Sequence, residues 1–343
     1  IVFGDWSSDV CSSDLIALEG VNGGIDDLTA PVLQLQGHGR GPLAAMLGFV
    51  DTTPVGGWIG GALQQARGRG DATLDLALAI PLLDASASTV DGSVELAGNS
   101  LRLSPDTPRL GELHGRVAFS RHGFRIVGAR ASALGGELAF EGGTQDDGTL
   151  RFEGRGVASA EALREGVELP VLAPLARLGE RLSGRAPYRV ELRFSDGRTE
   201  LDVASSLEGL ALTLPAPLDK PAAASWPLRV RTARLGDADA EALTIEIGDR
   251  LQARYERVPE GDGWRVRGGS VGIGTTAPPM PASGVAAVVE LPGLNVDAWQ
   301  AVFADRVAGV PAPAQGERVR PHADGGATTI DEALWPSQAT LRL

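Results

Sequence analysis

The sequence predicts a mainly β protein built from short antiparallel strands, and three observations support this. Apolar side chains recur at every second position in segments such as 74–80 and 188–194. This period places them on one face of an extended strand. The 343 residues include 46 glycines and 22 prolines, which is typical of many turns between short strands. Connections such as His122-Gly123 and Gly135-Gly136 are too short for a parallel crossover, so neighbouring strands are expected to be antiparallel.

The first 15 residues are expected to be foreign to the natural protein. Residues 4–15 read GDWSSDVCSSDL, which resembles the translation of a sequencing-library adapter. The single cysteine, Cys11, lies in this segment, so no disulfide or thiol chemistry is expected elsewhere. The last residues, 339–343, read as the opening of a further strand. We therefore interpret the chain as an internal fragment of a longer protein.

A first part is assigned to residues 16–183. It combines strands with short amphipathic helices near 42–66 and 159–183. Proline is favoured in the first turn of a helix, and Pro42 and Pro54 predict two helical pieces with a break at residue 53. Ser159 can cap a short helix, and Pro170 can begin another. The strands expected after the first helical region are 72–80, 90–97, 100–104, 112–120, 123–132, 136–141 and 148–155.

A second part, residues 184–343, is expected to continue the same sheet. A third helical patch is expected over 296–304, followed by a Pro- and Gly-rich loop over 305–328. The strands expected here are 186–195, 198–205, 208–214, 227–235, 241–248, 250–258, 263–273 and 284–291.

Charge and motifs argue against several classes of function. The formal net charge is −13 and there is no basic run, so nucleic acid is not an expected partner. The sequence contains no stretch of 18 apolar residues, so no membrane span is expected within this chain. The four histidines show no metal-ligand spacing, so neither a metal nor a cofactor is expected. Without a nucleophile elbow or phosphate-binding loop, no catalytic residue is assigned, and an enzyme is the least favoured interpretation.

One segment is more specific than a generic strand. It runs Ser206-Leu-Glu-Gly-Leu-Ala-Leu-Thr-Leu-Pro-Ala-Pro-Leu-Asp-Lys220 and is followed by Trp226-Pro-Leu-Arg229. This order resembles the YhdP branch of the AsmA-like proteins of Gram-negative bacteria. Further similar pieces are Gly41–Leu47 with Pro54, the strand 73–80, Gly98-Asn99, Ala133–Gly136 and Leu294–Trp299.

The resemblance implies a long antiparallel sheet curled into an open β-groove. It also implies a protein of the periplasm, anchored in the inner membrane, that carries phospholipid toward the outer membrane and contributes to outer-membrane lipid homeostasis. The expected partners are phospholipid and, through parts of the full-length protein outside this chain, the inner and outer membranes.

Two interpretations of the one-sided strands follow. In the first, the apolar face lines a track for acyl chains. The lining residues are then Leu76, Leu78, Val117, Phe119, Phe140, Phe152, Val190, Leu192, Leu201, Val203, Leu212, Ile245 and Val289. In the second, the same residues bury one another in a structural β-sandwich or scaffold domain of an envelope protein without lipid cargo. The pattern alone favours the sandwich, because buried cores are commoner than lipid grooves, and the resemblance reverses that preference.

Overall fold

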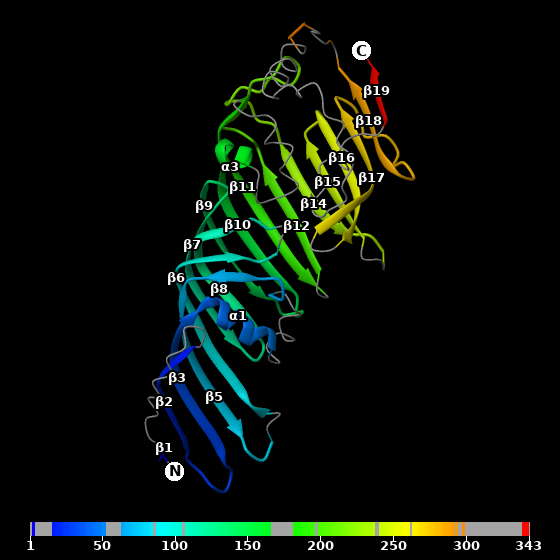
Figure 1. Cartoon of the computed structure of the whole chain (residues 1–343). Helices are drawn as coiled ribbons and strands as arrows, with labels where there is room; N and C mark the ends of the chain where they lie inside the picture. The colour runs from blue at the N-terminus through cyan, green and yellow to red at the C-terminus, as the bar shows by residue number, and fades with distance from the viewer. Residues whose placement is uncertain are drawn as a thin grey trace, which may run out of the picture. The chain divides into compact units, whose positions relative to one another are not determined.

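The computed structural model confirms a mainly β protein whose strands form a large, mostly antiparallel sheet, with two short helices among the described residues (Figure 1). It describes residues 2–3, 16–52, 63–84, 87–104, 107–165, 181–195, 198–236, 240–260, 263–291, 293, 297–298 and 338–342. The first elements are β1 (Val2–Phe3), β2 (Ala17–Ile25), β3 (Val32–Pro42), α1 (Leu43–Thr52), β4 (Arg67–Arg69), β5 (Asp71–Pro81), β6 (Thr89–Arg102), β7 (Leu110–Ser120), β8 (Gly123–Ala133), β9 (Gly136–Thr144), β10 (Leu150–Ser159) and α3 (Ala160–Glu165). They are followed by β11 (Leu182–Ser195), β12 (Arg198–Ser205), β13 (Leu210–Leu212), β14 (Leu228–Arg234), β15 (Glu241–Ile247), β16 (Leu251–Glu260), β17 (Gly263–Ile273), β18 (Gly284–Glu290) and β19 (Gln338–Arg342).

Packing divides the chain into two units. Unit 1 comprises residues 1–158 and 187–203, and unit 2 comprises 159–186 and 204–343. In unit 1, antiparallel pairing runs from β2 through β3, β5, β6, β7, β8 and β9 to β10. The short β4 pairs with the end of β6. Neighbours in sequence are therefore mostly neighbours in the sheet, as the short connections predict.

One expected turn proves to be a bulge. The sequence suggested two strands separated by Gly98-Asn99, but β6 continues through both residues. The register against β7 shifts between Ala97 and Asn99, and Gly98 has φ +86°, which glycine adopts without strain. The extra residue turns the Asn99 side chain inward, where it is 1% exposed.

Both helical regions begin as predicted, but residues 63–66, at the end of the first region, are not helical, and Leu182, expected in the second, begins β11 instead. Helix α1 begins directly after Pro42, and α3 begins directly after Ser159. The Ser159 hydroxyl accepts a hydrogen bond from the Ala162 amide at 3.2 Å, as expected of an N-cap. The helices expected to begin at Pro54 and Pro170, and nearly all of the patch over 296–304, lie outside the described residues.

Unit 2 departs from the antiparallel expectation at one place. β14 to β17 pair antiparallel, but β17 and β18 are parallel, and so are β18 and β19. The connection between β17 and β18 passes closely over β17. A Cβ at Gly272 would lie 2.5 Å from the Thr275 carbonyl oxygen and 2.6 Å from the Ala277 nitrogen. To pair parallel with β17, strand β18 must begin near the start of β17, so the ten-residue connection has to run back along that strand. The glycines at the end of β17 leave room for it.

Candidate functional site

The most extensive chemical feature of unit 1 is one face of its sheet, which we call the apolar face. Cross-strand partners share a face, so the registers define it directly. From β3 to β10 its members are Leu33, Leu35, Gly37, Leu74, Leu76, Leu78, Ile80, Val90, Gly92, Val94, Val117, Phe119, Phe124, Ile126, Phe140, Gly142, Phe152 and Gly154. Every member is glycine, aliphatic or phenylalanine, and none carries a charge.

The opposite face of unit 1 is charged. Arg151 contacts Glu191 at 3.1 Å, and Arg193 contacts the same carboxylate at 2.6 Å. His38 and Asp75 form another exposed pair. Exposed ion pairs contribute little to stability, so their main effect is to keep this face hydrated. The sheet therefore has one wet and one apolar surface.

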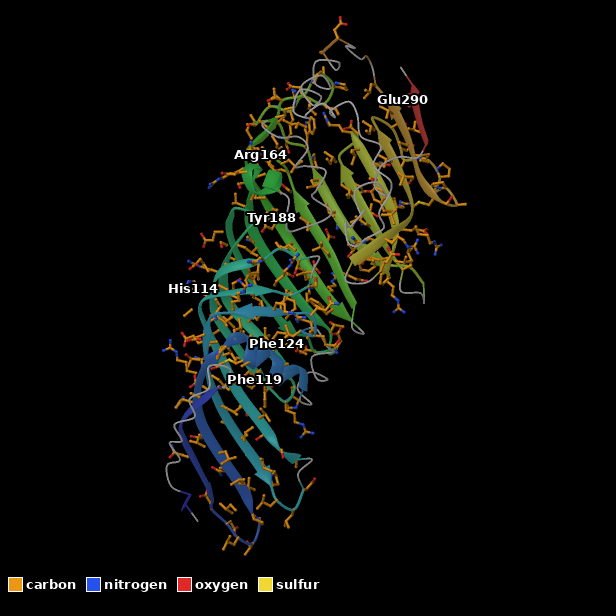
Figure 2. The ribbon with its side chains drawn as sticks, in the orientation of Figure 1. His114, Phe119, Phe124, Arg164, Tyr188 and Glu290 are labelled. Carbon is orange, nitrogen blue, oxygen red and sulfur yellow. The ribbon has the colours of Figure 1, made fainter. Side chains whose placement is uncertain are left out.

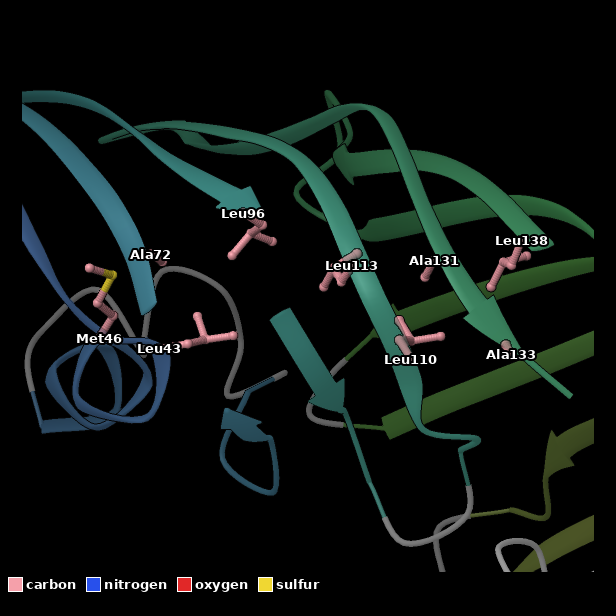
Figure 3. Close-up of a cluster of buried hydrophobic side chains, with 9 residues drawn as sticks. All are labelled: Leu43, Met46, Ala72, Leu96, Leu110, Leu113, Ala131, Ala133 and Leu138. Atoms are coloured by element: carbon pink, nitrogen blue, oxygen red, sulfur yellow. The ribbon is translucent and has the colours of Figure 1, made fainter. Parts of the chain in front are cut away.

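Helix α1 packs against β3 and β4 at one end of the first strands, on the apolar side of the sheet. Leu43 and Met46 are each 6% exposed and pack on the sheet (Figure 3). The sheet residues in this cluster are Ala72, Leu96, Leu110, Leu113, Ala131, Ala133 and Leu138. We call this cluster the α1 seat. Close approach of β4 completes it, because a Cβ at Gly68 would lie 2.7 Å from the Leu43 side chain.

Asn99 anchors the α1 seat from within. Its side-chain amide donates to the Asp71 carbonyl at 3.0 Å and lies 3.4 Å from the Arg69 carbonyl. Its side-chain oxygen accepts from the Ala97 amide at 2.9 Å. A buried amide with these partners costs little and fixes the β4–β5 connection against β6. The family-like pieces Gly41–Leu47, Gly98-Asn99 and Ala133–Gly136 thus contribute residues to one place.

Toward the turns at the other end of the strands, the apolar face carries half-buried side chains. Phe119 and Phe124 are cross-strand partners and lie next to each other (Figure 2). Phe152 contacts Phe124 with ring centroids 5.9 Å apart, and Phe194 with centroids 5.8 Å apart. Aromatic side chains from four strands, β7, β8, β10 and β11, therefore form a connected row.

Several aromatic rings of this face pack closely against a glycine of the neighbouring strand. A Cβ at Gly92 would come within 2.4 Å of the Phe119 ring, and one at Gly142 within 2.7 Å of the Phe152 ring. Gly156 has the same relation to Tyr188, whose pKa is raised to about 12 by burial. Rings that rest on the backbone gain packing without a second layer of protein above them.

All thirteen side chains predicted to line a lipid path are half-buried. Val117, Phe140 and Val190 pack against the α1 seat, whereas Leu76, Leu78, Phe119 and Phe152 are not among its contacts. Leu192, Leu201 and Val203 lie on β11 and β12 of unit 1. The structure therefore brings the β5–β10 members together on one face, while the role of all thirteen as lining residues stays a prediction.

Unit 2 has an apolar face of its own. Ile245 lies opposite Val230 and Ala253, and it packs against a buried cluster formed by Leu243, Ala253, Tyr255 and Val285. Val289 lies beside Ile273 and Leu341. Leu212 instead packs against a separate small core of Ala160, Leu182, Ala186 and Leu210. The three predicted lining residues of unit 2 are thus distributed over different surroundings.

The segment that carried the family resemblance folds around its lysine. Lys220 is 3% exposed, and its ammonium donates to the carbonyl oxygens of Leu207 at 2.8 Å, Leu210 at 2.7 Å and Ala224 at 2.7 Å. Burial lowers the pKa of Lys220, and the Glu208 carboxylate opposes that shift. The Trp226 ring lies 5.9 Å from the ammonium. This motif therefore has a structural role, as a carbonyl cage that fixes the loop after β13.

Sequence reasoning missed the roles of Asn99, Lys220 and the glycines beneath the rings. The glycines left a usable signal, because Gly142, Gly154 and Gly156 fall in the apolar phase of their strands. No sequence pattern indicated the buried roles of Asn99 and Lys220, because the carbonyl groups that they bind are distant in sequence or depend on loop conformation.

The described residues hold no group of three or more histidine, cysteine, aspartate or glutamate side chains placed to bind a metal ion. Among the same residues, no helix is long and apolar enough to cross a membrane.

Comparison with known proteins connects this architecture to one family. A model of the YhdP protein family matches residues 14–332. The intermembrane phospholipid transporter YhdP of Escherichia coli (strain K12) is 27% identical over 298 residues, which cover 81% of this chain and 22% of the relative. The chain thus spans about a fifth of that relative's length, and no solved structure matches. Because the family match covers nearly the whole chain, this protein belongs to the YhdP family.

Proposed function

We propose that this chain is a segment of a periplasmic phospholipid transport protein whose apolar face shields acyl chains from water. The observation that carries the proposal is the uninterrupted apolar face from β3 to β10, with half-buried side chains toward the turns. The E. coli relative, named as an intermembrane phospholipid transporter, supplies the cargo class. In the full-length protein, an inner-membrane anchor and an outer-membrane end would complete the route and serve outer-membrane lipid homeostasis.

The chemistry required is burial and not bond making. Each buried methylene is worth about 0.8 kcal/mol, so a single acyl chain is held firmly without a directional contact. The head group stays in water, where it keeps its hydration. No catalytic residue is needed for this task, and we propose that the protein is not an enzyme.

Photo-crosslinking tests the proposal directly. A photoreactive amino acid at Leu192, on the apolar side of β11, is expected to capture phospholipid when the protein is expressed in a Gram-negative bacterium. The matched control is Arg189, which is exposed on the opposite face of the same strand. Mass spectrometry should find a phospholipid adduct at Leu192 only. Equal adducts at both positions, or none at either, would count against an acyl-chain track.

The scaffold alternative is supported by one observation, the buried core to which α1 contributes Leu43 and Met46. A structural domain without cargo would have the same core. It would, however, be purified without phospholipid, and charged substitutions at Leu76 or Phe119 would change its stability without changing lipid content. Lipid extraction and quantification on the full chain and on Leu76→Asp therefore separate the two functions.

A further inference from the structure

We infer that helix α1 acts as a steric stop on the apolar face. The helix confines acyl chains to the part of that face nearest the turns that follow β5, β7 and β9. The inference rests on the proposed function and specifies how the cargo lies. We call the part concerned the open strip, defined by Leu76, Leu78, Val90, Phe119, Phe124 and Phe152. All six are half-buried, and none contributes to the α1 seat.

The first argument is that α1 already occupies its share of the apolar face. Leu43 and Met46 of the helix are each 6% exposed, and Ala72 of β5, which lies beside them, is 3% exposed (Figure 3). A protein interior packed to this degree leaves no room for a hydrocarbon chain. An acyl chain could reach these residues only if the helix left its seat.

The second argument is that the seat is tied down by polar contacts as well as by packing. The first amide of α1, on Leu43, donates to the Gly70 carbonyl at 2.8 Å. Asn99 holds the same connection through the Asp71 carbonyl. Moving the helix away from β4 would break the Leu43–Gly70 hydrogen bond together with the apolar contacts of Leu43 and Met46. The helix is thus built as a fixed element.

The third argument is one of length. On β5 the apolar positions beyond the α1 seat run from Leu76, in the open strip, to Ile80, which is about 13 Å at the rise of an extended strand. One leaflet of bilayer hydrocarbon is about 15 Å thick, half of a typical core. Measured along the strand, the uncovered part of the apolar face is therefore about as long as one extended acyl chain. With α1 closing one side, the head group is placed at the turns that follow β5, β7 and β9.

The test uses the full chain and two synthetic phosphatidylethanolamine probes. One carries a diazirine near the end of an acyl chain, and the other carries it on the head group. After irradiation, the labelled residues are mapped by mass spectrometry. The acyl probe is expected on Leu76, Val90, Phe119 or Phe152, and the head-group probe on the turns 82–84, 121–122 and 145–149. Acyl labelling of Ala72, Leu96 or Leu113 at a comparable level would overturn the inference while leaving the proposed function intact. No labelling on the apolar face by either probe would overturn the proposed function itself.

A helix variant provides the second measurement. Leu43→Ala combined with Met46→Ala loosens the helix, and acyl labels should then spread to Ala72 and Leu96, which are cross-strand partners beside it. The matched control is Ala44→Ser on the exposed side of the same helix, which should leave the label map unchanged. An unchanged map for a folded double variant would show that α1 is not the stop. If circular dichroism shows that the double variant is unfolded, the wild-type map alone decides.

Discussion

The buried ammonium of Lys220 is the residue that gives the family-like segment its shape. Three backbone carbonyls accept its hydrogen bonds at 2.8 Å or less, and all three bonds are lost if the ammonium is removed. A phosphate-binding role is not needed to explain this residue, the single lysine of the chain.

Lys220→Met is therefore expected to lower the free energy of unfolding by about 3 kcal/mol or more, because buried carbonyls lose their hydrogen bonds. Urea unfolding followed by circular dichroism measures the change. Arg254→Met, an exposed charge removed from β16, should cost less than about 0.5 kcal/mol. A Lys220→Met variant as stable as this control would contradict the cage.

The pairing of Gly156 with Tyr188 can be tested by a double-mutant cycle. Gly156→Ala places a methyl group 2.7 Å from the Tyr188 ring and should cost about 1–3 kcal/mol. In a Tyr188→Ala background the same change should cost much less, because the obstructing ring is gone. Equal costs in both backgrounds would mean that the ring does not depend on the glycine.

Tyr188 also gives a pH-dependent expectation. Its pKa is raised to about 12 by burial, whereas a tyrosine in the unfolded chain ionises near pH 10. Between these values the unfolded chain loses the proton first, so stability falls as pH rises, by up to about 2–3 kcal/mol. Spectrophotometric titration of Tyr255→Phe isolates Tyr188, since the chain has two tyrosines. A native midpoint near 10 would argue that Tyr188 is solvated.

At the scale of elements, helix α1 contains one residue of low helix propensity that its packing does not require. Gly48 lies within the helix, and a Cβ there would meet nothing within 4 Å. Gly48→Ala should stabilise the protein by about 0.5–1 kcal/mol through helix propensity. Gly68→Ala is the matched opposite, because its Cβ would press on Leu43, and it should destabilise. Differential scanning calorimetry should show that the two substitutions shift the unfolding temperature in opposite directions. A shift in the same direction would refute the seating of α1 on β4.

The elements also show what periodicity can and cannot predict. The alternation at Leu74–Ile80 and Tyr188–Phe194 predicted both strands and their apolar side, because a period of two has one structural meaning. It did not predict the bulge at Asn99, since one inserted residue changes the phase without changing composition. Nor did it predict the parallel pairing of β18, which depends on the close return path over Gly272. The α1 seat joins residues of α1, β5, β6, β7, β8 and β9 in one cluster, an arrangement that no local pattern encodes.

At the scale of the whole molecule, cargo and stability should be linked. A ligand that binds the folded state stabilises it by mass action, by about 2.7 kcal/mol at a concentration 100 times its dissociation constant. Phospholipid-loaded protein should therefore unfold at a higher temperature than the same protein after delipidation. Glycerophosphoethanolamine, which has the head group without acyl chains, should not restore the midpoint. An unchanged midpoint on reloading with phospholipid would contradict binding by the apolar face.

The aromatic rings that pack against glycines bear on how a cargo would move. The apolar face offers only glycine, aliphatic and phenylalanine side chains on every strand from β3 to β10, and neighbouring strands are only about 4.8 Å apart. A hydrocarbon chain displaced by one strand exchanges one set of methylene contacts for an almost equal set, so successive positions differ little in free energy. The result is a smooth landscape with low barriers to sliding, where net direction would have to come from supply at one end and removal at the other.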